Sequence, residues 1–234
     1  RREGADLVLL PGDLFDGERV YPETVAALTA ALGSLDVPVI IAPGNHDPAD
    51  GRSPYLTAQW PENVHIFTQP VMSSFDVPAL NCAVHGCAFT APHREDEPLA
   101  GFSAPRDGRV HLFCLHGEVG LAGRYGPIPP EALGHVHACS GLQRAGDTFW
   151  AYCGCPEGRG FDECGEKGAL LVELTPGAAP TARFLPLCRR QYRIVETDWT
   201  EFAPALAALP AEDLVRIILT GACDRAPDLA ALTR

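Results

Sequence analysis

The sequence contains no long apolar run and few basic residues. No stretch approaches the roughly 18 consecutive apolar residues that cross a bilayer, and the first residues lack the pattern of a secretory signal, so we expect no membrane association. Lysine and arginine number 18 against 30 aspartates and glutamates, which gives a net charge of −12 at pH 7. Such a chain offers no basic side-chain groove for nucleic acid. Binding to a nucleic acid would need metal ions or a more basic partner.

The nine cysteines are odd in number and follow no regular spacing. A disulfide framework is therefore not indicated, and reduced thiols in a cytoplasmic protein are the simplest interpretation. The chain begins at Arg1 without an initiator methionine. We therefore expect a further segment before it in the natural protein.

Apolar segments separated by turn residues predict an α/β fold. Residues 5–10 and 37–41 are apolar enough for strands buried on both faces, and residues 22–35 between them have apolar side chains at helical spacing. This order is typical of a βαβ unit. Further strands are expected at residues 64–67, 71–75, 81–89, 109–116, 148–152, 168–174, 182–186, 192–195 and 214–219, with a second helix at 201–209.

Polar side chains follow several of these strands at the point where each strand ends. In open α/β sheets, ligands bind at the carboxyl ends of the strands, so side chains placed there are expected to form one site. The candidates are Asp13, Asn45, His116, His135 and His137. Carboxylate, amide oxygen and imidazole ligands together suit a divalent ion such as Mn²⁺, Fe²⁺ or Zn²⁺.

Five such ligands are too many for one tetrahedral ion but fit two ions that share the carboxylate of Asp13. Two ions about 3.5–4 Å apart can hold the attacking and leaving oxygens during phosphoryl transfer. His46 is placed to donate a proton to a leaving oxygen, and Asp47 to fix the tautomer of the His46 ring. Asp16 either caps a helix or orients a neighbour of the site.

Four motifs in this order resemble the calcineurin-like metallophosphoesterase superfamily: GDLFD at residues 12–16, GNHD at 44–47, LHG at 115–117 and GHVH at 134–137. The resemblance implies a four-layer α/β/β/α sandwich over residues 1–198 and the start of a small α+β capping domain at residues 199–234. It implies that Asp13 bridges two metal ions and that His137 binds the first. Asn45, His116 and His135 would bind the second.

Residues 152–168 are similar, within this superfamily, to a loop of the SbcD-type DNA repair exonucleases. This resemblance implies a DNA nuclease that uses two divalent ions, with Mn²⁺ typical, and that works as a homodimer with an SbcC-type ATPase. It gives His46 the task of protonating the leaving group and contacting the scissile phosphate. Arg159 in the loop is a candidate for a phosphate contact.

Two features differ from the pattern of the superfamily. An Asp-x-His motif that supplies two ligands of the first metal ion does not precede Asp13 here, which leaves that ion with Asp13 and His137. In addition, only residues 130–133 separate a proline pair from Gly134, too few for the full strand expected before the GHVH motif.

Two other functions therefore stay open. One is a phosphodiesterase or phosphatase that acts on small molecules, because a fold does not fix a substrate. The other is a non-catalytic protein that only binds a partner ATPase, because the first metal site is incomplete.

Overall fold

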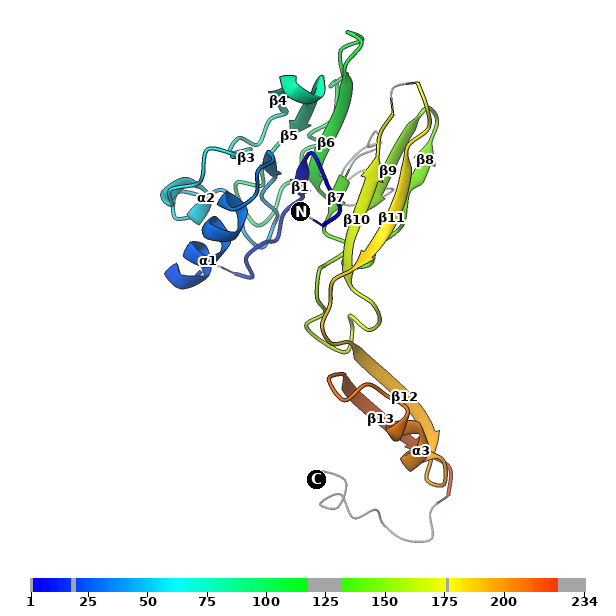
Figure 1. Ribbon diagram of the computed structural model, residues 1–234. Helices are drawn as coiled ribbons and strands as arrows, with labels where there is room; N and C mark the ends of the chain where they lie inside the picture. The colour runs from blue at the N-terminus through cyan, green and yellow to red at the C-terminus, as the bar shows by residue number, and fades with distance from the viewer. Residues whose placement is uncertain (1, 18–19, 118–131, 176, 223–234) are drawn as a thin grey trace. The chain divides into compact units, whose positions relative to one another are not determined.

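The computed structural model describes residues 2–17, 20–117, 132–175 and 177–222, and the chain divides into two compact units (Figure 1). The described parts of Arg1–Cys155 and Ala169–Leu185 form the first unit. Those of Pro156–Gly168 and Pro186–Arg234 form the second. The boundary expected between residues 198 and 199 stays a prediction for the domains of the natural protein.

The first sheet of the first unit is a parallel three-stranded sheet in the order β1-β2-β3. Its strands are β1 (Val8–Leu10), β2 (Val39–Ile41) and β3 (Val64–Ile66), and helix α1 (Pro22–Gly33) connects β1 to β2. The predicted βαβ unit is therefore confirmed. Helix α1 buries Leu32 against Val39 and Ile41 of β2, which is completely buried.

The second sheet has six strands in the order β4-β5-β6-β7-β9-β8. They are β4 (Ser73–Val77), β5 (Cys82–Gly86), β6 (Val110–His116), β7 (Ala132–Gly134), β8 (Gln143–Ala145) and β9 (Thr148–Tyr152). Strands β5, β6, β7 and β9 pair in parallel with one another in this order. The edge strands β4 and β8 pair antiparallel with β5 and β9. Strands β10 (Gly168–Glu173) and β11 (Thr181–Pro186) form a separate two-stranded sheet.

The two larger sheets pack face to face through one apolar cluster. Ile40 of β2 contacts the cluster that contains Val84 of β5 and Cys114 of β6, all three completely buried. Helix α1 covers the other face of the first sheet (Figure 1). On the far face of the second sheet, Leu99 and Phe102 of a loop pack on Phe113. The described residues thus form an α/β arrangement of a helix, two sheets and a covering loop.

Three short elements and one strand were not expected from the sequence. The three are helix α2 (Pro54–Thr57), the 3₁₀ helix at Pro78–Leu80 and strand β8. The fourth element is β7. Residues 130–133 were too few to predict a full strand before Gly134. It forms because three residues suffice for a strand that pairs with β6 on one side and β9 on the other. A strand of three residues thus precedes His135, and the expectation that the full strand before the GHVH motif is shortened stays a prediction.

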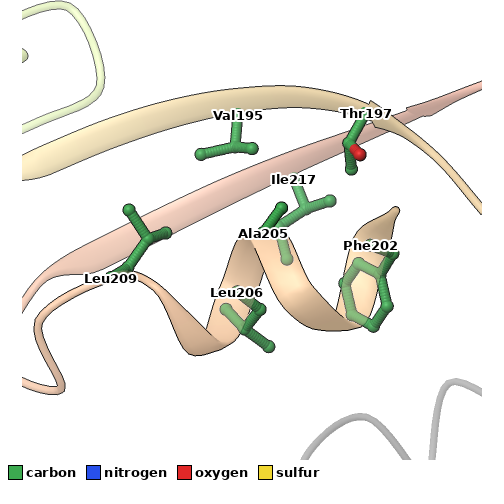
Figure 2. A pocket seen from close by; sticks show the side chains of 7 residues that line it. All are labelled: Val195, Thr197, Phe202, Ala205, Leu206, Leu209 and Ile217. Atoms are coloured by element: carbon green, nitrogen blue, oxygen red, sulfur yellow. The ribbon is translucent and has the colours of Figure 1, made fainter. Parts of the chain in front are cut away.

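The second unit contains a two-stranded parallel sheet and one helix. Strand β12 (Tyr192–Asp198) pairs with β13 (Leu214–Thr220), and α3 (Phe202–Ala207) lies between them in the sequence. Figure 2 shows a pocket of this unit that is lined by Phe202 and Leu206 of α3 and by Val195 and Ile217 of the sheet. The assignment of this segment to a capping domain stays a prediction.

In the described ranges, no helix has both the length and the apolar character needed to cross a bilayer. Nor does a disulfide join any of the eight cysteines that these ranges contain.

The side-chain amide of Asn63 joins the end of α1 to β2. Its Nδ2 group lies 3.1 Å from the carbonyl oxygens of Leu32 and Leu35 and 3.0 Å from that of Val37. We expect Asn63→Ala to lower the free energy of unfolding by about 1–3 kcal/mol, because three partly buried hydrogen bonds to backbone carbonyls are lost. Urea denaturation measures the change.

Gln143→Ala is the matched control, because among the described residues the Gln143 amide donates to a single group, the Ser140 carbonyl in an exposed hairpin. It should change the free energy of unfolding by less than about 0.5 kcal/mol. Equal effects of the two substitutions would show that Asn63 has no special role.

Candidate metal centre

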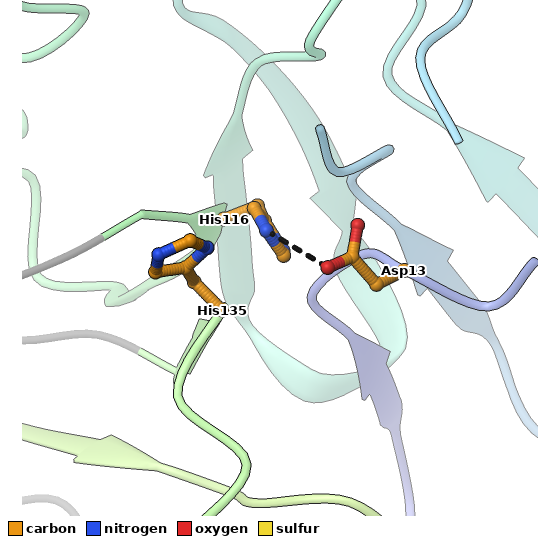
Figure 3. Close-up of side chains that lie close together, drawn as sticks. All are labelled: Asp13, His116 and His135. Carbon is orange, nitrogen blue, oxygen red and sulfur yellow. Dashed lines mark ion pairs between the residues drawn. The ribbon is translucent and has the colours of Figure 1, made fainter. Parts of the chain in front are cut away.

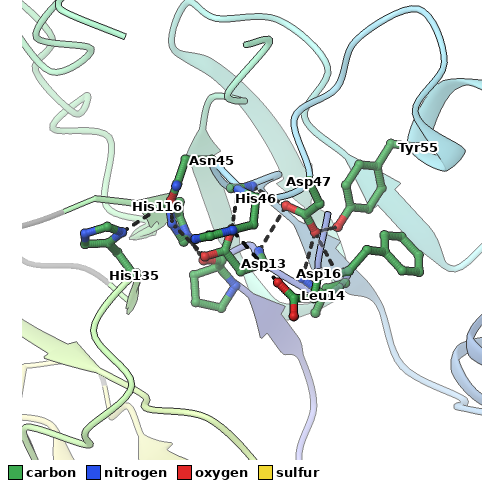
Figure 4. A network of polar contacts seen from close by, with 12 residues as sticks. Asp13, Leu14, Asp16, Asn45, His46, Asp47, Tyr55, His116 and His135 are labelled. Carbon is green, nitrogen blue, oxygen red and sulfur yellow. Dashed lines mark hydrogen bonds and ion pairs between the residues drawn. The ribbon is translucent and has the colours of Figure 1, made fainter. Parts of the chain in front are cut away.

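Four polar side chains converge at the carboxyl ends of both large sheets (Figures 3 and 4). Asp13 follows β1 and Asn45 follows β2, while His116 ends β6 and His135 follows β7. Nε2 of His116 lies 2.9 Å from Oδ1 of Asn45 and 3.3 Å from Oδ2 of Asp13. Nδ1 of His135 lies 3.3 Å from the same oxygen of Asn45. Ligand atoms of Asp13, His116 and His135 all lie within 4.8 Å of one another.

The hydrogen bonds of His116 leave a lone pair directed at this cluster. Nδ1 lies 2.9 Å from the carbonyl oxygen of Pro11, an acceptor, so Nδ1 carries the proton of the neutral ring. Nε2 then carries no proton, and its lone pair faces the side-chain oxygens of Asn45 and Asp13. Burial also lowers the pKa of His116, although the Asp13 carboxylate opposes this shift. Three acceptors that meet without a donor fit a divalent cation.

The Asp47 carboxylate holds together the two loops that carry Asp13 and Asn45. Oδ1 accepts hydrogen bonds from the backbone N–H groups of Asp13 (3.1 Å) and Gly44 (2.8 Å). Oδ2 accepts from the N–H groups of Leu14 (2.7 Å) and Phe15 (3.1 Å) and from the Tyr55 hydroxyl. The Asp47 carboxylate thus binds these two loops and Tyr55, and not the His46 ring as expected from the sequence.

Burial raises the pKa of Asp47, whereas its hydrogen bonds from Tyr55, Gly44 and Phe15 lower it. Burial likewise raises the pKa of Tyr55 well above its usual value, and the nearby Asp47 carboxylate adds to this rise. The phenol therefore stays protonated and donates. No periodic pattern or motif in the sequence indicates this role for Tyr55, which lies eight residues beyond Asp47 in helix α2.

Two glycines allow the loops to approach each other at the site. A Cβ atom on Gly44 would collide with Oδ1 of Asp13, and a Cβ atom on Gly134 would collide with the carbonyl oxygen of Pro11 and lie 2.6 Å from Nδ1 of His116. Any larger residue at either position would displace one of these neighbouring groups, so both positions require glycine.

Asp13 and His135 both adopt backbone conformations that non-glycine residues rarely adopt. Their φ angles are +54° and +88°. Left-handed backbone of this kind is costly and persists where the surrounding structure holds it, as at functional sites. For Asp13, the hydrogen bond from its N–H group to Asp47 and that from the His46 N–H group to Oδ1 (3.0 Å) provide this support.

The remaining predicted site residues lie outside this cluster. The exposed His46 ring has its Nδ1 3.9 Å from Oδ1 of the exposed Asp16. His137 is not in the group of converging ligand atoms found among the described residues, and its carbonyl oxygen accepts from the N–H group of Cys155 (3.3 Å). Arg159 belongs to the second unit, where its N–H group donates to Glu163.

Comparisons with known proteins agree with the chemistry of this centre. The sequence profile of the family described as "Calcineurin-like phosphoesterase" matches residues 1–132. The protein described as "Uncharacterized metallophosphoesterase YhaO" from Bacillus subtilis (strain 168) is 29% identical over 195 residues. The match covers 75% of this chain and 47% of YhaO, so the chain spans about half the length of this relative.

Gly44→Ala should weaken metal binding, because the new methyl group displaces the Asp13 carboxylate. We expect the dissociation constant for Mn²⁺ to rise by about tenfold or more, as measured by isothermal titration calorimetry. Gly51→Ala is the matched control, since a Cβ atom there meets nothing within 4 Å. A Gly44→Ala protein that binds Mn²⁺ as tightly as the control would contradict this geometry.

Tyr55→Phe tests the hydrogen bonds of Asp47 while it keeps the ring packed between Phe15 and Trp60. Loss of the hydroxyl should lower the free energy of unfolding by about 1–2 kcal/mol, because a buried carboxylate loses a donor. Chemical denaturation measures this change. The same substitution at Tyr21, which is 75% exposed, should have no measurable effect. Comparable losses for both tyrosines would argue against the role of Tyr55.

Proposed function

The chain belongs to the calcineurin-like phosphoesterase family, and from this premise we propose that it is the nuclease subunit of a DNA repair complex. Members of the family hydrolyse phosphoesters with divalent metal ions, which the centre at Asp13, His116 and His135 is suited to bind. The finer assignment is a two-metal phosphodiester hydrolase that uses Mn²⁺.

The observation that carries the proposal is the convergence of acceptor atoms without a donor between them. Nε2 of His116 and the side-chain oxygens of Asp13 and Asn45 meet where both sheets end. Bound divalent ions would activate water and stabilise the charge that develops on a phosphoryl group. In this proposal Asp13, Asn45, His116 and His135 hold the ions, with His137 as a further ligand.

His46 is the residue proposed to protonate the leaving oxygen. Its N–H group donates to Asp13, which fixes the residue beside the metal ligands, while its ring stays exposed to solvent. Asp16, 3.9 Å from the ring, can hold the imidazolium close to the site. An exposed ring beside the metal ligands suits a general acid that must reach a substrate.

DNA as the substrate is supported by the similarity of residues 152–168 to a loop of the SbcD-type exonucleases. The net charge of −12 means that the positive charge for DNA must come from the bound metal ions and from a partner. An SbcC-type ATPase is the proposed partner, with a homodimer of this chain at the centre of the complex. Arg159 is the proposed phosphate contact in the loop.

The proposal extends to the fold and location of the natural protein. We assign it a four-layer α/β/β/α sandwich over residues 1–198, a capping domain that begins at residue 199, and a cytoplasmic location. Two other functions compete with the nuclease: hydrolysis of small phosphodiesters or phosphomonoesters, and binding of a partner ATPase without catalysis.

A direct assay separates these functions. Purified chain is incubated with Mn²⁺ and either linear duplex DNA or bis(p-nitrophenyl) phosphate, with and without EDTA. The nuclease proposal expects DNA cleavage that EDTA abolishes. Asp13→Asn should reduce cleavage by about a hundredfold or more, because a metal ligand loses its charge.

Asp36→Asn removes an exposed carboxylate before β2 and serves as the matched control with unchanged activity. Turnover of the small ester alone would replace the nuclease by a small-molecule phosphodiesterase. If neither substrate is hydrolysed and Mn²⁺ does not bind, the non-catalytic function is the correct one.

A further inference from the structure

A continuous chain of hydrogen bonds crosses the second sheet far from the metal centre. Oγ of Ser74 on β4 lies 2.7 Å from Nδ1 of His85 on β5. Nε2 of His85 lies 2.9 Å from Nδ1 of His111 on β6, and Nε2 of His111 lies 2.9 Å from Oδ1 of Asp107. His111 is five residues before His116, about 16 Å along the strand, so the two sites are separate.

The Asp107 carboxylate determines the direction of these hydrogen bonds. Arg109 donates to it from both side chain and backbone, which keeps the pKa of Asp107 well below its usual value, so the carboxylate only accepts. His111 therefore donates from Nε2; with both rings neutral, it accepts at Nδ1, and His85 donates from Nε2 and accepts at Nδ1. The Ser74 hydroxyl must then donate its proton to His85.

His85 is buried whereas Ser74 is exposed, so a substrate can reach the hydroxyl at the Ser74 end of these hydrogen bonds. His85 is 1% exposed, and its ring stacks on that of His111 with a centroid distance of 5.1 Å. Burial and the nearby His111 lower the pKa of His85, so the ring is neutral and able to accept a proton. Ser74, by contrast, is exposed to solvent, with its oxygen lone pairs free of the histidine.

We propose that Ser74 is an activated nucleophile, with His85 as its general base, that reacts with small carboxylic esters. A hydroxyl directed at a neutral imidazole, whose other nitrogen is held by a partner connected to a carboxylate, is the arrangement that activates serine in acyl transfer. This activity needs no metal ion and is independent of the proposed nuclease.

The reaction balances without a cofactor. Oγ of Ser74 forms a bond to the acyl carbon, and its proton moves to Nδ1 of His85. The ester C–O bond breaks, and the leaving alkoxide takes the proton from His85. Water then attacks the acyl-serine in the same way, with His85 again as the base, and releases the carboxylic acid and Ser74.

A hollow beside Met72 and Phe102 is the place proposed for the acyl group. It has a volume of about 360 Å³ and is lined by the apolar side chains of Val71, Met72 and Phe102 and also by the acidic residues Asp96 and Glu97. Met72 lies two residues before Ser74, and the Phe102 ring lies 5.1 Å from the His85 ring. Within the described residues β4 is an edge strand, and such an edge presents backbone N–H groups that can stabilise a developing oxyanion.

A serine-directed probe tests the proposal on the full chain. The protein is treated with phenylmethylsulfonyl fluoride in EDTA, and the labelled peptide is identified by mass spectrometry. We expect sulfonylation at Ser74, and Ser74→Ala should abolish it. Asp107→Asn should slow labelling by about tenfold or more, because the histidines lose the carboxylate that fixes their tautomers.

Ser73→Ala is the matched control, since this neighbouring exposed serine donates to the backbone carbonyl of Gly86 (3.4 Å) and bonds no histidine in the part of the chain that the structure describes. Hydrolysis of p-nitrophenyl acetate in EDTA should likewise fall at least tenfold in Ser74→Ala and stay unchanged in Ser73→Ala. Labelling no faster at Ser74 than at Ser73 would overturn the proposal and leave the hydrogen bonds with a structural role. Because EDTA removes the metal, failure here and failure of the nuclease proposal are distinguishable.

Discussion

The hydrogen bonds of one carboxylate, that of Asp47, position the ligand loops of the metal centre. Four backbone N–H groups from two loops, together with the Tyr55 hydroxyl, donate to this buried group. Without such an acceptor, the N–H groups of Asp13 and Gly44 would be buried without partners. The two loops would then separate rather than bring Asp13 and Asn45 together. The candidate ligands Asp13 and Asn45 are thus positioned by a residue that binds the backbone of their loops.

The parts of this site that the sequence predicted are those that depend on strand ends. Apolar runs located β1, β2 and β6, and the polar residues that follow them are the ones that meet in the structure. The role of Asp47 was not predictable in the same way. Its position beside His46 suggested a contact between neighbours, whereas the backbone turn directs its side chain into the opposite loop, a long-range outcome that no local pattern contains.

Short elements marked the other limit of prediction. Strand β7 has three residues and no periodic pattern, and it exists because strands on both sides supply its hydrogen bonds. Tyr55 lies in a four-residue helix, which is also too short to show a periodic pattern. The hydrogen bonds from Ser74 to Asp107 also required the tertiary structure, because the two histidines that they join, His85 and His111, are separated by 26 residues.

The division of the metal ligands between two sheets has a consequence for the kinetics of folding. Asp13 and Asn45 belong to a sheet whose strands are close in sequence, whereas His116 and His135 follow strands of the other sheet. Closing long loops is slow, so the local βαβ segment can form before the second sheet docks on it. The ligand set is complete only after docking. A bound cation would therefore slow the unfolding of the native state far more than it would speed folding.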